Sequence, residues 1–291
     1  MPASPQIYDS ARLAHCYAND RPPVHQAICA RLFAALPSGA EMRSALDVGC
    51  GAGASVAALV AHSRHVTGVD PSPAMLREAQ RRLPTSTFLQ GTADALPVES
   101  EAFDLVTAAG SLNYADVHRA LSEVSRVLSP DGYFAAYDFC TGRVLPEDAL
   151  SASCFASFEQ GFPWPPGYPL DLEFLPYREH ALALRLYDEF VVELRMSADA
   201  YIRYVMSETN VEAAISAGLS EEDARDACWS AFGPLFEREP RAVGFRAVLA
   251  LAEKIPSPSR SSAVSYLDDA EPAPLKNTGV DQAGRDDAGD A

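Results

Sequence analysis

Short apolar segments alternate with amphipathic segments between residues 44 and 139, and this alternation limits the possible folds more than any other feature of the sequence. The apolar segments predict strands at 44–48, 65–70, 86–90, 103–109 and 133–139, and the segments between them predict helices at 53–62, 72–83 and 116–128. Parallel strands need long crossover connections, and helical crossovers cover both faces of the sheet. The alternation therefore predicts an α/β fold with a parallel sheet between two helical layers.

The segments on either side of this alternation follow other patterns. Residues 1–43 are predicted to be largely helical. Residues 141–182 contain the run F-P-W-P-P-G-Y-P, which is too rich in proline for a regular element. The elements expected to complete a domain over 44–254 are a strand at 184–195, helices at about 198–236 and a last strand at 243–252.

The final segment, residues 255–291, differs in composition from the rest. It carries three basic and seven acidic side chains and has few apolar residues. Such a segment cannot bury enough apolar surface to offset the entropy of ordering it. We therefore expect a disordered acidic tail.

The net charge of the chain limits the kinds of molecule that it can bind. The 291 residues carry a formal net charge of −17, and no cluster of Lys or Arg offers the basic surface that nucleic acids require. No stretch of eighteen apolar residues predicts a membrane span, and the first ten residues do not resemble a signal peptide. We expect a cytoplasmic protein that acts on a small molecule and binds neither nucleic acid nor membrane.

Cysteine and histidine spacing indicates no metal site. The six cysteines are scattered, which favours reduced thiols over disulfides or zinc. His62 and His65 form an H-x-x-H pair, but no further ligand lies near them in the sequence. The sequence therefore predicts a protein without a bound metal.

A glycine-rich stretch, A-L-D-V-G-C-G-A-G-A at 45–54, follows the first predicted strand. Gly49, Gly51 and Ala54 satisfy the G-x-G-x-x-[GA] pattern of dinucleotide sites, and Asp70 lies near the distance expected of a ribose-binding acid. The glycines alone leave two cofactors open, a nicotinamide dinucleotide and S-adenosyl-L-methionine (SAM).

Asp47 favours SAM. A dinucleotide would place its pyrophosphate at the start of the helix after the turn, where a nearby carboxylate would repel it. SAM has no phosphate, and its sulfonium and ammonium groups are cationic, so an acid at the strand end is favourable. We therefore interpret the stretch as a SAM site.

Several motifs together resemble those of class I SAM-dependent methyltransferases, and most closely the small-molecule type 11 methyltransferases. They are D-x-G-x-G-x-G at 47–53, Q-G-T-A-D-A-L-P at 90–97, F-D-L-V at 103–106, R-V-L-S-P-D-G-Y-F at 126–134 and, near the N-terminus, Y-A-N-D-R-P-P at 17–23. Apart from the N-terminal motif, the resemblance covers roughly 44–139. It implies a Rossmann-like, doubly wound and mostly parallel sheet of seven strands with an antiparallel last strand. N-terminal helices would cover the cofactor, and a helical, aromatic cap would be inserted.

The resemblance implies roles for individual residues. Gly49, Gly51 and Gly53 would let the backbone approach SAM without a side-chain clash. Asp70 would accept hydrogen bonds from both ribose hydroxyls. The other implied cofactor residues are Asp47 and Arg21 at the methionyl end, Tyr17 near the sulfonium, Met75 against the adenine face, Asp94 and the backbone of Ala93 at the adenine edge, and Ala109 at the end of the fourth strand.

Ordinary structural roles compete with four of these assignments. Met75 could be a core methionine of an amphipathic helix, and Asp94 could be an exposed loop acid. Tyr17 and Arg21 could be capping or surface residues. The sequence leaves these alternatives open.

The segment 108–116 follows the fourth strand and should face the reacting methyl group, since ligands bind at the carboxyl ends of parallel strands. Type 11 relatives often have H-W-x-D here, whereas this chain has Asn113 and Tyr114. Asparagine is not a base, so either the acceptor needs no deprotonation or another group removes the proton. Asp138 and Tyr137 are candidates for that group, and Tyr114 is a candidate aromatic wall beside the methyl. We expect His25 and His118 to be surface or helix residues instead.

Aromatic side chains concentrate after the fifth strand, where the family builds substrate lids. They are Phe155, Phe158, Phe162, Trp164, Tyr168, Phe174 and Tyr177. A homodimer interface is the competing use of these side chains.

The leading hypothesis is methyl transfer to a small metabolite by in-line displacement, mainly through proximity and desolvation. Three alternatives stay open: an enzyme that uses SAM for an intramolecular displacement or cyclisation, a NAD-dependent oxidoreductase, and a non-catalytic SAM-binding subunit. No Ser/Tyr/Lys or His/Arg set for hydride transfer is visible in the sequence.

Overall fold

The computed structural model describes residues 5–38, 42–165, 170–237 and 240–256. The predicted acidic tail lies outside the described residues from 257 onward, and so does Tyr168. Within the described ranges, no helix combines the length and the apolar character that crossing a membrane would require.

Five parallel strands form the part of the sheet that the alternating pattern predicts. Their order is β3-β2-β1-β4-β5, with bounds β1 Ser44–Val48, β2 His65–Asp70, β3 Thr87–Gln90, β4 Phe103–Ala109 and β5 Leu128–Phe139. The connecting helices are α3 (Ala54–Leu59), α4 (Pro73–Arg82) and α5 (Val117–Val127). Two of them begin at side-chain caps, where Ser72 accepts from the Met75 N–H and Asp116 accepts from the Arg119 N–H.

Helices cover both faces of this sheet. The apolar stripe of α5, including Leu121 and Val124, packs in one core cluster, whereas α3 packs with α2 (Val24–Ala35) in the cluster on the opposite face. This arrangement confirms the predicted doubly wound α/β fold.

The remaining strands extend the sheet beyond β5. The last strand, β8 (Arg241–Lys254), runs antiparallel to β5, as expected. β8 also pairs along its whole length with the antiparallel β7 (Leu182–Met196). A short strand, β6 (Arg143–Leu145), also pairs with β8. Its partners on β8 lie next to the partners of the end of β5. The sheet therefore has eight strands in seven positions, because the fifth position is divided between β5 and β6.

The break between β5 and β6 has a packing reason. Tyr204 accepts a hydrogen bond from the Gly142 N–H at 3.1 Å, and Tyr201 donates to the Gly142 carbonyl at 2.8 Å. These bonds replace the ladder bonds that Gly142 would otherwise make, and both tyrosines are fully buried.

The fifth strand was expected at 133–139, after the S-P-D-G sequence at 129–132. In the structure S-P-D-G lies within β5, where the register with β4 shifts between Phe103 and Leu105. Asp131 takes a positive φ of 63° in this irregular stretch. The turn residues are therefore accommodated as a bulge in the strand.

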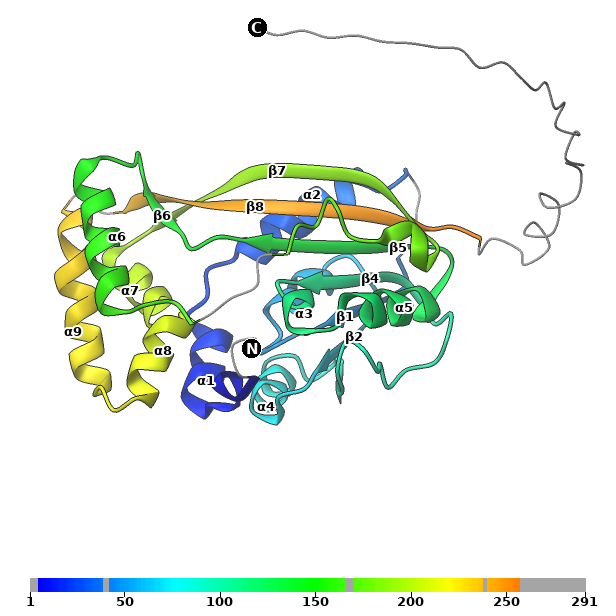
Figure 1. Ribbon diagram of the computed structural model, residues 1–291, viewed down its shortest axis with the longest axis horizontal. Coiled ribbons are helices and arrows are strands. Elements are labelled where there is room, and N and C mark those ends of the chain that lie inside the picture. Colours follow the sequence, from blue (N-terminus) through cyan, green and yellow to red (C-terminus); the bar gives the residue numbers. More distant parts are fainter. Residues whose placement is uncertain (1–4, 39–41, 166–169, 238–239, 257–291) are drawn as a thin grey trace, which may run out of the picture. The chain divides into compact units, whose positions relative to one another are not determined.

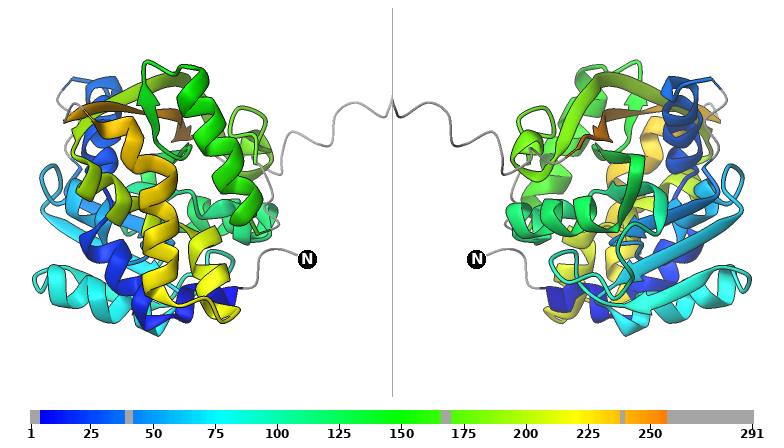
Figure 2. Two further views of the ribbon diagram at one scale, coloured as in Figure 1. Left: turned by 90° about the vertical axis from the view of Figure 1, so that its left-hand side faces the viewer. Right: turned by 90° about the vertical axis from the view of Figure 1, so that its right-hand side faces the viewer.

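A helical layer lies at one end of β7 and β8 (Figure 1). It contains α6 (Ala149–Gly161), α7 (Ala198–Met206), α8 (Thr209–Ser216) and α9 (Glu221–Phe232), followed by the turn η4 (Gly233–Phe236). The N-terminal turn η1 (Pro5–Asp9) and α1 (Ala11–Asn19) lie between this layer and α4 (Figures 1 and 2).

The aromatic segment after β5 does not form one lid. Phe155, Phe158 and Phe162 are buried among the cap helices, where the first two rings pack against Phe232. Tyr177 begins the turn η3 (Tyr177–His180) and is buried in the core cluster on the α5 face. Trp164 and Phe174 are exposed. Burial of apolar area therefore accounts for most of the aromatic residues that the sequence singled out.

Candidate functional site

The glycine-rich turn joins β1 to α3 at the carboxyl ends of β1 and β2. Gly49, Gly51 and Gly53 all have positive φ, between 50° and 85°, a region that residues with a Cβ atom rarely adopt. A Cβ on Gly49 would lie 2.3 Å from the Cβ of Ser111, so this position admits no side chain. A Cβ on Gly51 would meet no atom within 4 Å. Gly49 is thus required by packing, whereas Gly51 faces open space.

Asp70 ends β2 and holds this turn. Its carboxylate accepts from the Gly51 N–H at 2.8 Å and from the Ser72 N–H at 2.8 Å. The residue is 8% exposed, and burial raises the pKa of the carboxyl above its ordinary value. One buried acid therefore joins the turn to the start of α4, and each of its oxygens retains a lone pair for a further donor.

Asp47 lies beneath the turn and is fully buried. Its carboxylate accepts hydrogen bonds from the Ser55 hydroxyl and, at 2.6 Å, from the Thr107 hydroxyl. Burial raises the pKa of this carboxyl to about 6 despite these bonds. Asp47 thus ties β1 to α3 and β4, a structural role that the sequence did not reveal, and its predicted place near the methionyl end stays a prediction.

Helix α1 covers the turn from one side. Leu13, Ala14 and Ala18 pack against Ala52 of the turn and against Met75, which is 1% exposed. Met75 therefore behaves as a core residue under α1, and its contact with an adenine ring stays a prediction.

Asp94 and Ala93 follow β3 at the next strand end. Asp94 lies 3.7 Å from Arg119 of α5, and a hydrogen bond from Thr92 is the main cause that lowers the pKa of its carboxyl. Ala93 packs against the core cluster of the α5 face. Both positions lie on the strand-end side predicted for the adenine edge.

The segment after β4 passes close to the turn. Ala109 ends β4, and Ser111 contacts Gly49 before the short turn η2 (Leu112–Tyr114). The Oδ1 atom of Asn113 is buried and has no hydrogen-bond partner. A buried amide oxygen without a donor is costly, and it marks a place where a bound group could donate.

Three tyrosines from distant segments meet beside Asn113. The hydroxyl groups of Tyr8 and Tyr114 are 2.8 Å apart, and the Tyr8 ring packs edge-on against Tyr114 and Tyr17. Burial raises the pKa of Tyr8 well above its ordinary value, so it is a neutral phenol. Tyr8 was not among the predicted site residues, because no motif in the first ten residues points to it.

Arg21 lies behind Tyr17 and has a protein partner already. Its guanidinium stacks on the Tyr17 ring at 4.2 Å, donates to the Ser207 carbonyl at 3.0 Å and pairs with Glu208 at 3.3 Å. Its Nε atom is buried without a partner. The predicted bond from Arg21 to a cofactor carboxylate stays a prediction, and Nε is the donor left for it.

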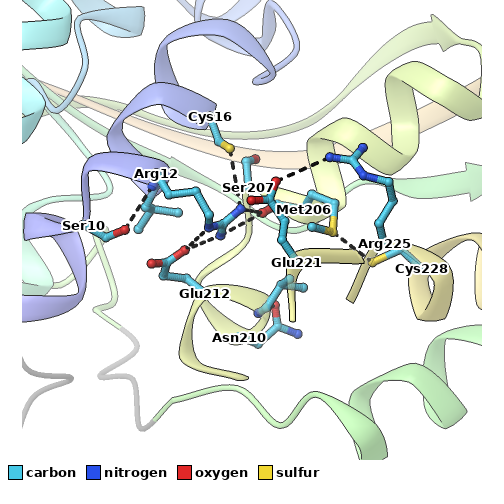
Figure 3. A network of polar contacts seen from close by, with 12 residues as sticks. Ser10, Arg12, Cys16, Met206, Ser207, Asn210, Glu212, Glu221, Arg225 and Cys228 are labelled. Carbon is cyan, nitrogen blue, oxygen red and sulfur yellow. Dashed lines mark hydrogen bonds and ion pairs between the residues drawn. The ribbon is translucent and has the colours of Figure 1, made fainter. Parts of the chain in front are cut away.

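A second arginine, Arg12, binds the same corner between α7 and α8 (Figure 3). Its Nε donates to Glu212 at 2.7 Å, and both terminal nitrogens lie 3.3 Å from the Met206 carbonyl oxygen. Arg12 and Arg21 therefore fasten the N-terminal helical segment to the cap helices by charge-assisted hydrogen bonds.

His25 was expected as a surface or helix residue, and it lies in α2, partly buried near the end of β5. Its Nδ1 atom is 2.9 Å from the Tyr137 hydroxyl, and its ring packs edge-on against Tyr137 and Phe139. Burial, reinforced by Arg21, lowers the pKa of His25 to about 4, so the imidazole is neutral near pH 7. Its position directly after the R-P-P motif was the only sequence signal for this placement.

Asp138 and Asn113 line one small pocket. The lining residues are Ala108, Gly110, Ser111, Leu112, Asn113, Tyr137, Asp138, Leu170 and Leu172. Asp138 is exposed at the strand end, yet the surrounding protein raises the pKa of its carboxyl. The candidate catalytic residues Asn113 and Asp138 are therefore brought together, and Tyr114 lies next to Asn113 with 43% of its surface exposed.

No metal was predicted at His62 and His65, because no further ligand lies near them in the sequence. In the structure the two side chains have different surroundings. His62 stacks on Phe33 with ring centroids 4.1 Å apart, and His65 begins β2. The stacked ring gives His62 a packing role.

One protein-family model matches the part of the chain that contains this site. Residues 46–136 match the model described as "Methyltransferase domain". The matched range runs from β1 to the middle of β5 and contains the turn, Asp70 and Asn113. Residues 46–136 are therefore similar to a methyltransferase domain.

Several curated methyltransferases are similar to this domain. An uncharacterized methyltransferase of Mycobacterium tuberculosis is 39% identical over 97 residues, which cover 33% of this chain and 39% of that protein. YcgJ of Bacillus subtilis is 34% identical over 111 residues, or 36% and 42% of the two chains. The ubiquinone/menaquinone biosynthesis C-methyltransferase UbiE of Campylobacter jejuni is 32% identical over 101 residues, or 32% and 43%. The chain thus matches less than half the length of each of these relatives.

A solved structure supports the fold beyond the matched domain. A protein of Anaeromyxobacter dehalogenans assigned as a type II methyltransferase superposes with a TM-score of 0.61 at 22% identity, covering 79% of this chain and 97% of that one. At this identity the likeness establishes the architecture, including elements outside the methyltransferase domain's matched range, and not the substrate.

Proposed function

We propose that this protein is a SAM-dependent methyltransferase that transfers a methyl group to a small-molecule acceptor. The observation that carries the proposal is the link between Gly51 and Asp70. The space that a side chain at Gly51 would occupy is open. Asp70, the acid that accepts from the Gly51 N–H, ends the adjacent strand β2. This pairing suits a ligand with a ribose at the strand ends of an α/β sheet.

The residues present fit SAM. The space beside Gly51 lets backbone approach a ligand closely, and the lone pairs of Asp70 can accept from two ribose hydroxyls. Two buried polar atoms of the site lack protein partners, the Asn113 Oδ1 acceptor and the Arg21 Nε donor. SAM has an ammonium group that can donate to the first and a carboxylate that can accept from the second.

When bound, SAM supplies an electrophilic methyl group on a sulfonium. The protein's part is to align an acceptor in line with that methyl and to exclude water. Tyr8, Tyr17 and Tyr114 would form an aromatic wall that favours a cationic methyl, and the Tyr8 ring packs edge-on against the other two. Asn113 would orient a donor group at the same place through Oδ1.

His25 is a further candidate base, because its neutral imidazole contacts the hydroxyl of Tyr137, which lines the pocket with Asn113 and Asp138. Its low pKa makes it a weak base, so it suits an acceptor whose proton is already acidic. Asp138 is the other candidate base, with a raised pKa that makes its carboxylate more basic than usual. The acceptor's own acidity decides which of the two is used, and an acceptor without a proton needs neither.

We further propose a cytoplasmic protein that does not bind nucleic acid. All six cysteines are free, which supports a reducing compartment, and the net charge of −17 disfavours a polyanionic substrate. Exposed Trp164 and Phe174 support the proposed homodimer contact of the segment after β5.

Calorimetry with SAM and S-adenosylhomocysteine tests the cofactor site. Asp70→Ala should weaken binding at least about tenfold, because two ribose hydroxyls lose their acceptor. Asp104→Ala is the matched control, since Asp104 also accepts from two backbone N–H groups, those of Arg43 and Ser44, but at the opposite end of the sheet. Equal affinities in the wild type and both variants would contradict the proposal.

Mass spectrometry tests the reaction itself. The protein is incubated with SAM alone and with SAM plus a small-molecule extract. Methyl transfer yields S-adenosylhomocysteine only when an acceptor is present. Methylthioadenosine formed from SAM alone would instead favour intramolecular displacement, and enhanced NADH fluorescence on binding would favour the oxidoreductase hypothesis.

A further inference from the structure

Two histidines and a glutamate meet on the α5 face of the sheet, outside the proposed methyl-transfer site. His118 lies in the first turn of α5, and Glu179 and His180 end the turn η3. One ligand atom from each residue lies within 4.8 Å of the others. The ligands come from segments about sixty positions apart, so no sequence spacing could have indicated them.

The distances between these atoms suit a small tetrahedral metal ion. His118 Nδ1 is 3.2 Å from His180 Nε2 and 3.7 Å from Glu179 Oε2. Ligands about 2.0 Å from a tetrahedral zinc ion are about 3.3 Å apart. The nitrogen pair therefore already has the required separation, and the exposed Glu179 side chain has to move by only a few tenths of an ångström relative to His118.

A hydrogen-bond chain fixes the tautomer of His180. The Ser122 hydroxyl donates to the His118 carbonyl at 2.9 Å, so its oxygen is left to accept from His180 Nδ1 at 3.0 Å. A protonated Nδ1 leaves Nε2 with a free lone pair, and Nε2 is the atom that faces His118. This is the arrangement of a metal-ligating histidine whose other nitrogen donates to a second group.

We propose that His118, Glu179 and His180 bind a divalent transition-metal ion, zinc in the first place. Two imidazoles and one carboxylate form a common zinc ligand set, which leaves a fourth position for water. Magnesium and calcium prefer oxygen ligands, so this set disfavours them. This proposal differs from the prediction, drawn from sequence spacing alone, that the protein has no metal site.

The bound ion would fasten η3 to α5. The segment leading into η3 carries Leu170 and Leu172, which line the pocket that contains Asn113 and Asp138. Zinc would therefore stabilise one wall of that pocket without contacting it. The proposed metal binding does not depend on the proposed methyl transfer.

Zinc titration of the tag-free, chelator-treated full chain tests the site. We expect one equivalent of Zn²⁺ to bind, and His118→Ala and His180→Ala each to weaken binding at least about tenfold. Ser122→Ala should weaken it less, because it removes only the bond that orients His180. His15→Ala is the matched control, since His15 is an exposed helical histidine 4.0 Å from Glu78 but has no second histidine beside it.

Two further measurements complete the test. Cobalt substitution should give the intense visible absorption of a tetrahedral ion, and the absorption should be lost in His180→Ala. Amide hydrogen exchange over 170–180 should slow when zinc is added to the wild type and not to that variant. Absence of stoichiometric binding would overturn the proposal, and so would binding that survives both histidine variants. Zinc held instead by Cys140, an exposed free cysteine, would give that result and would be lost in Cys140→Ser.

Discussion

The two halves of the candidate site are built by different means. The glycine-rich turn uses backbone: positive φ angles, N–H groups donated to Asp70, and a close contact with Ser111. The tyrosine and arginine cluster beside Asn113 uses side chains from η1, α1, η2 and the α7–α8 corner. The comparison shows that the first half depends on backbone conformation and on contacts at the strand ends. The second half exists only while α1 stays fastened to the cap helices.

The largest expected effect concerns the turn. Gly49→Ala should lower the free energy of unfolding by about 3–5 kcal/mol, because it adds left-handed strain to an overlap with Ser111. Gly51→Ala, with φ of 50° and no neighbour within 4 Å, should cost only about 1–2 kcal/mol. Chemical denaturation measures both.

The same pair of variants separates folding from binding. Gly51→Ala should remain folded and bind SAM at least about tenfold more weakly, because its methyl group would project into the space proposed for the cofactor. Calorimetry on the folded variant measures this change. Wild-type affinity in Gly51→Ala would show that the open space beside the turn is not the cofactor site.

The second prediction concerns the side-chain half. Arg21 and Glu208 are 14% and 9% exposed, so Arg21→Leu leaves a nearly buried carboxylate unpaired and should cost about 3 kcal/mol of stability. The double variant Arg21→Leu/Glu208→Gln should recover a large part of that loss. Denaturant melts of the three proteins measure the coupling.

An exposed pair supplies the control for this prediction. Arg225 and Glu221 are 3.5 Å apart on α9 and are 44% and 52% exposed. Arg225→Leu should change stability by no more than about 0.5 kcal/mol. Equal costs for Arg21→Leu and Arg225→Leu would mean that ion pairing does not fasten α1 to the cap.

The smallest expected effect is the pH dependence contributed by His25. Its folded-state pKa of about 4 lies below the ordinary 6.5, so the unfolded chain binds more protons between these values. Stability from a neutral His25 is therefore present above pH 6.5 and is lost as the pH falls toward 4. The loss between pH 7 and pH 5 should be about 1–2 kcal/mol.

His25→Asn isolates this contribution. Buried Asp47, with a pKa raised to about 6, contributes in the opposite direction, because the folded state then binds more protons than the unfolded state between about 4 and 6. Asp47 is present in both proteins, so its contribution cancels when the pH profile of stability of His25→Asn is subtracted from that of the wild type. Parallel pH profiles for the two proteins would show that His25 is not held neutral by its surroundings.

How far the sequence predicts the site differs from residue to residue. Asp70 and the glycines were predicted from motif spacing along two successive strands, β1 and β2. Asp47 was found as well, but its bonds to Ser55 and Thr107 were not, since those hydroxyls reach it only in the folded sheet. Tyr8 and Glu208 lie outside every motif and take part only through packing between distant segments.

The alternation of apolar segments by itself determined the α/β class with its parallel sheet, and the glycines determined the turn, because hydrophobic periodicity and glycine conformation act over a few residues. Tertiary structure alone decided the division of β5 from β6 at Gly142, the neutral state of His25 and the meeting of His118 with His180. Each of these depends on atoms more than fifty positions away in the chain. Burial and hydrogen-bond partners at that range are properties of the packed fold, and no local pattern encodes them.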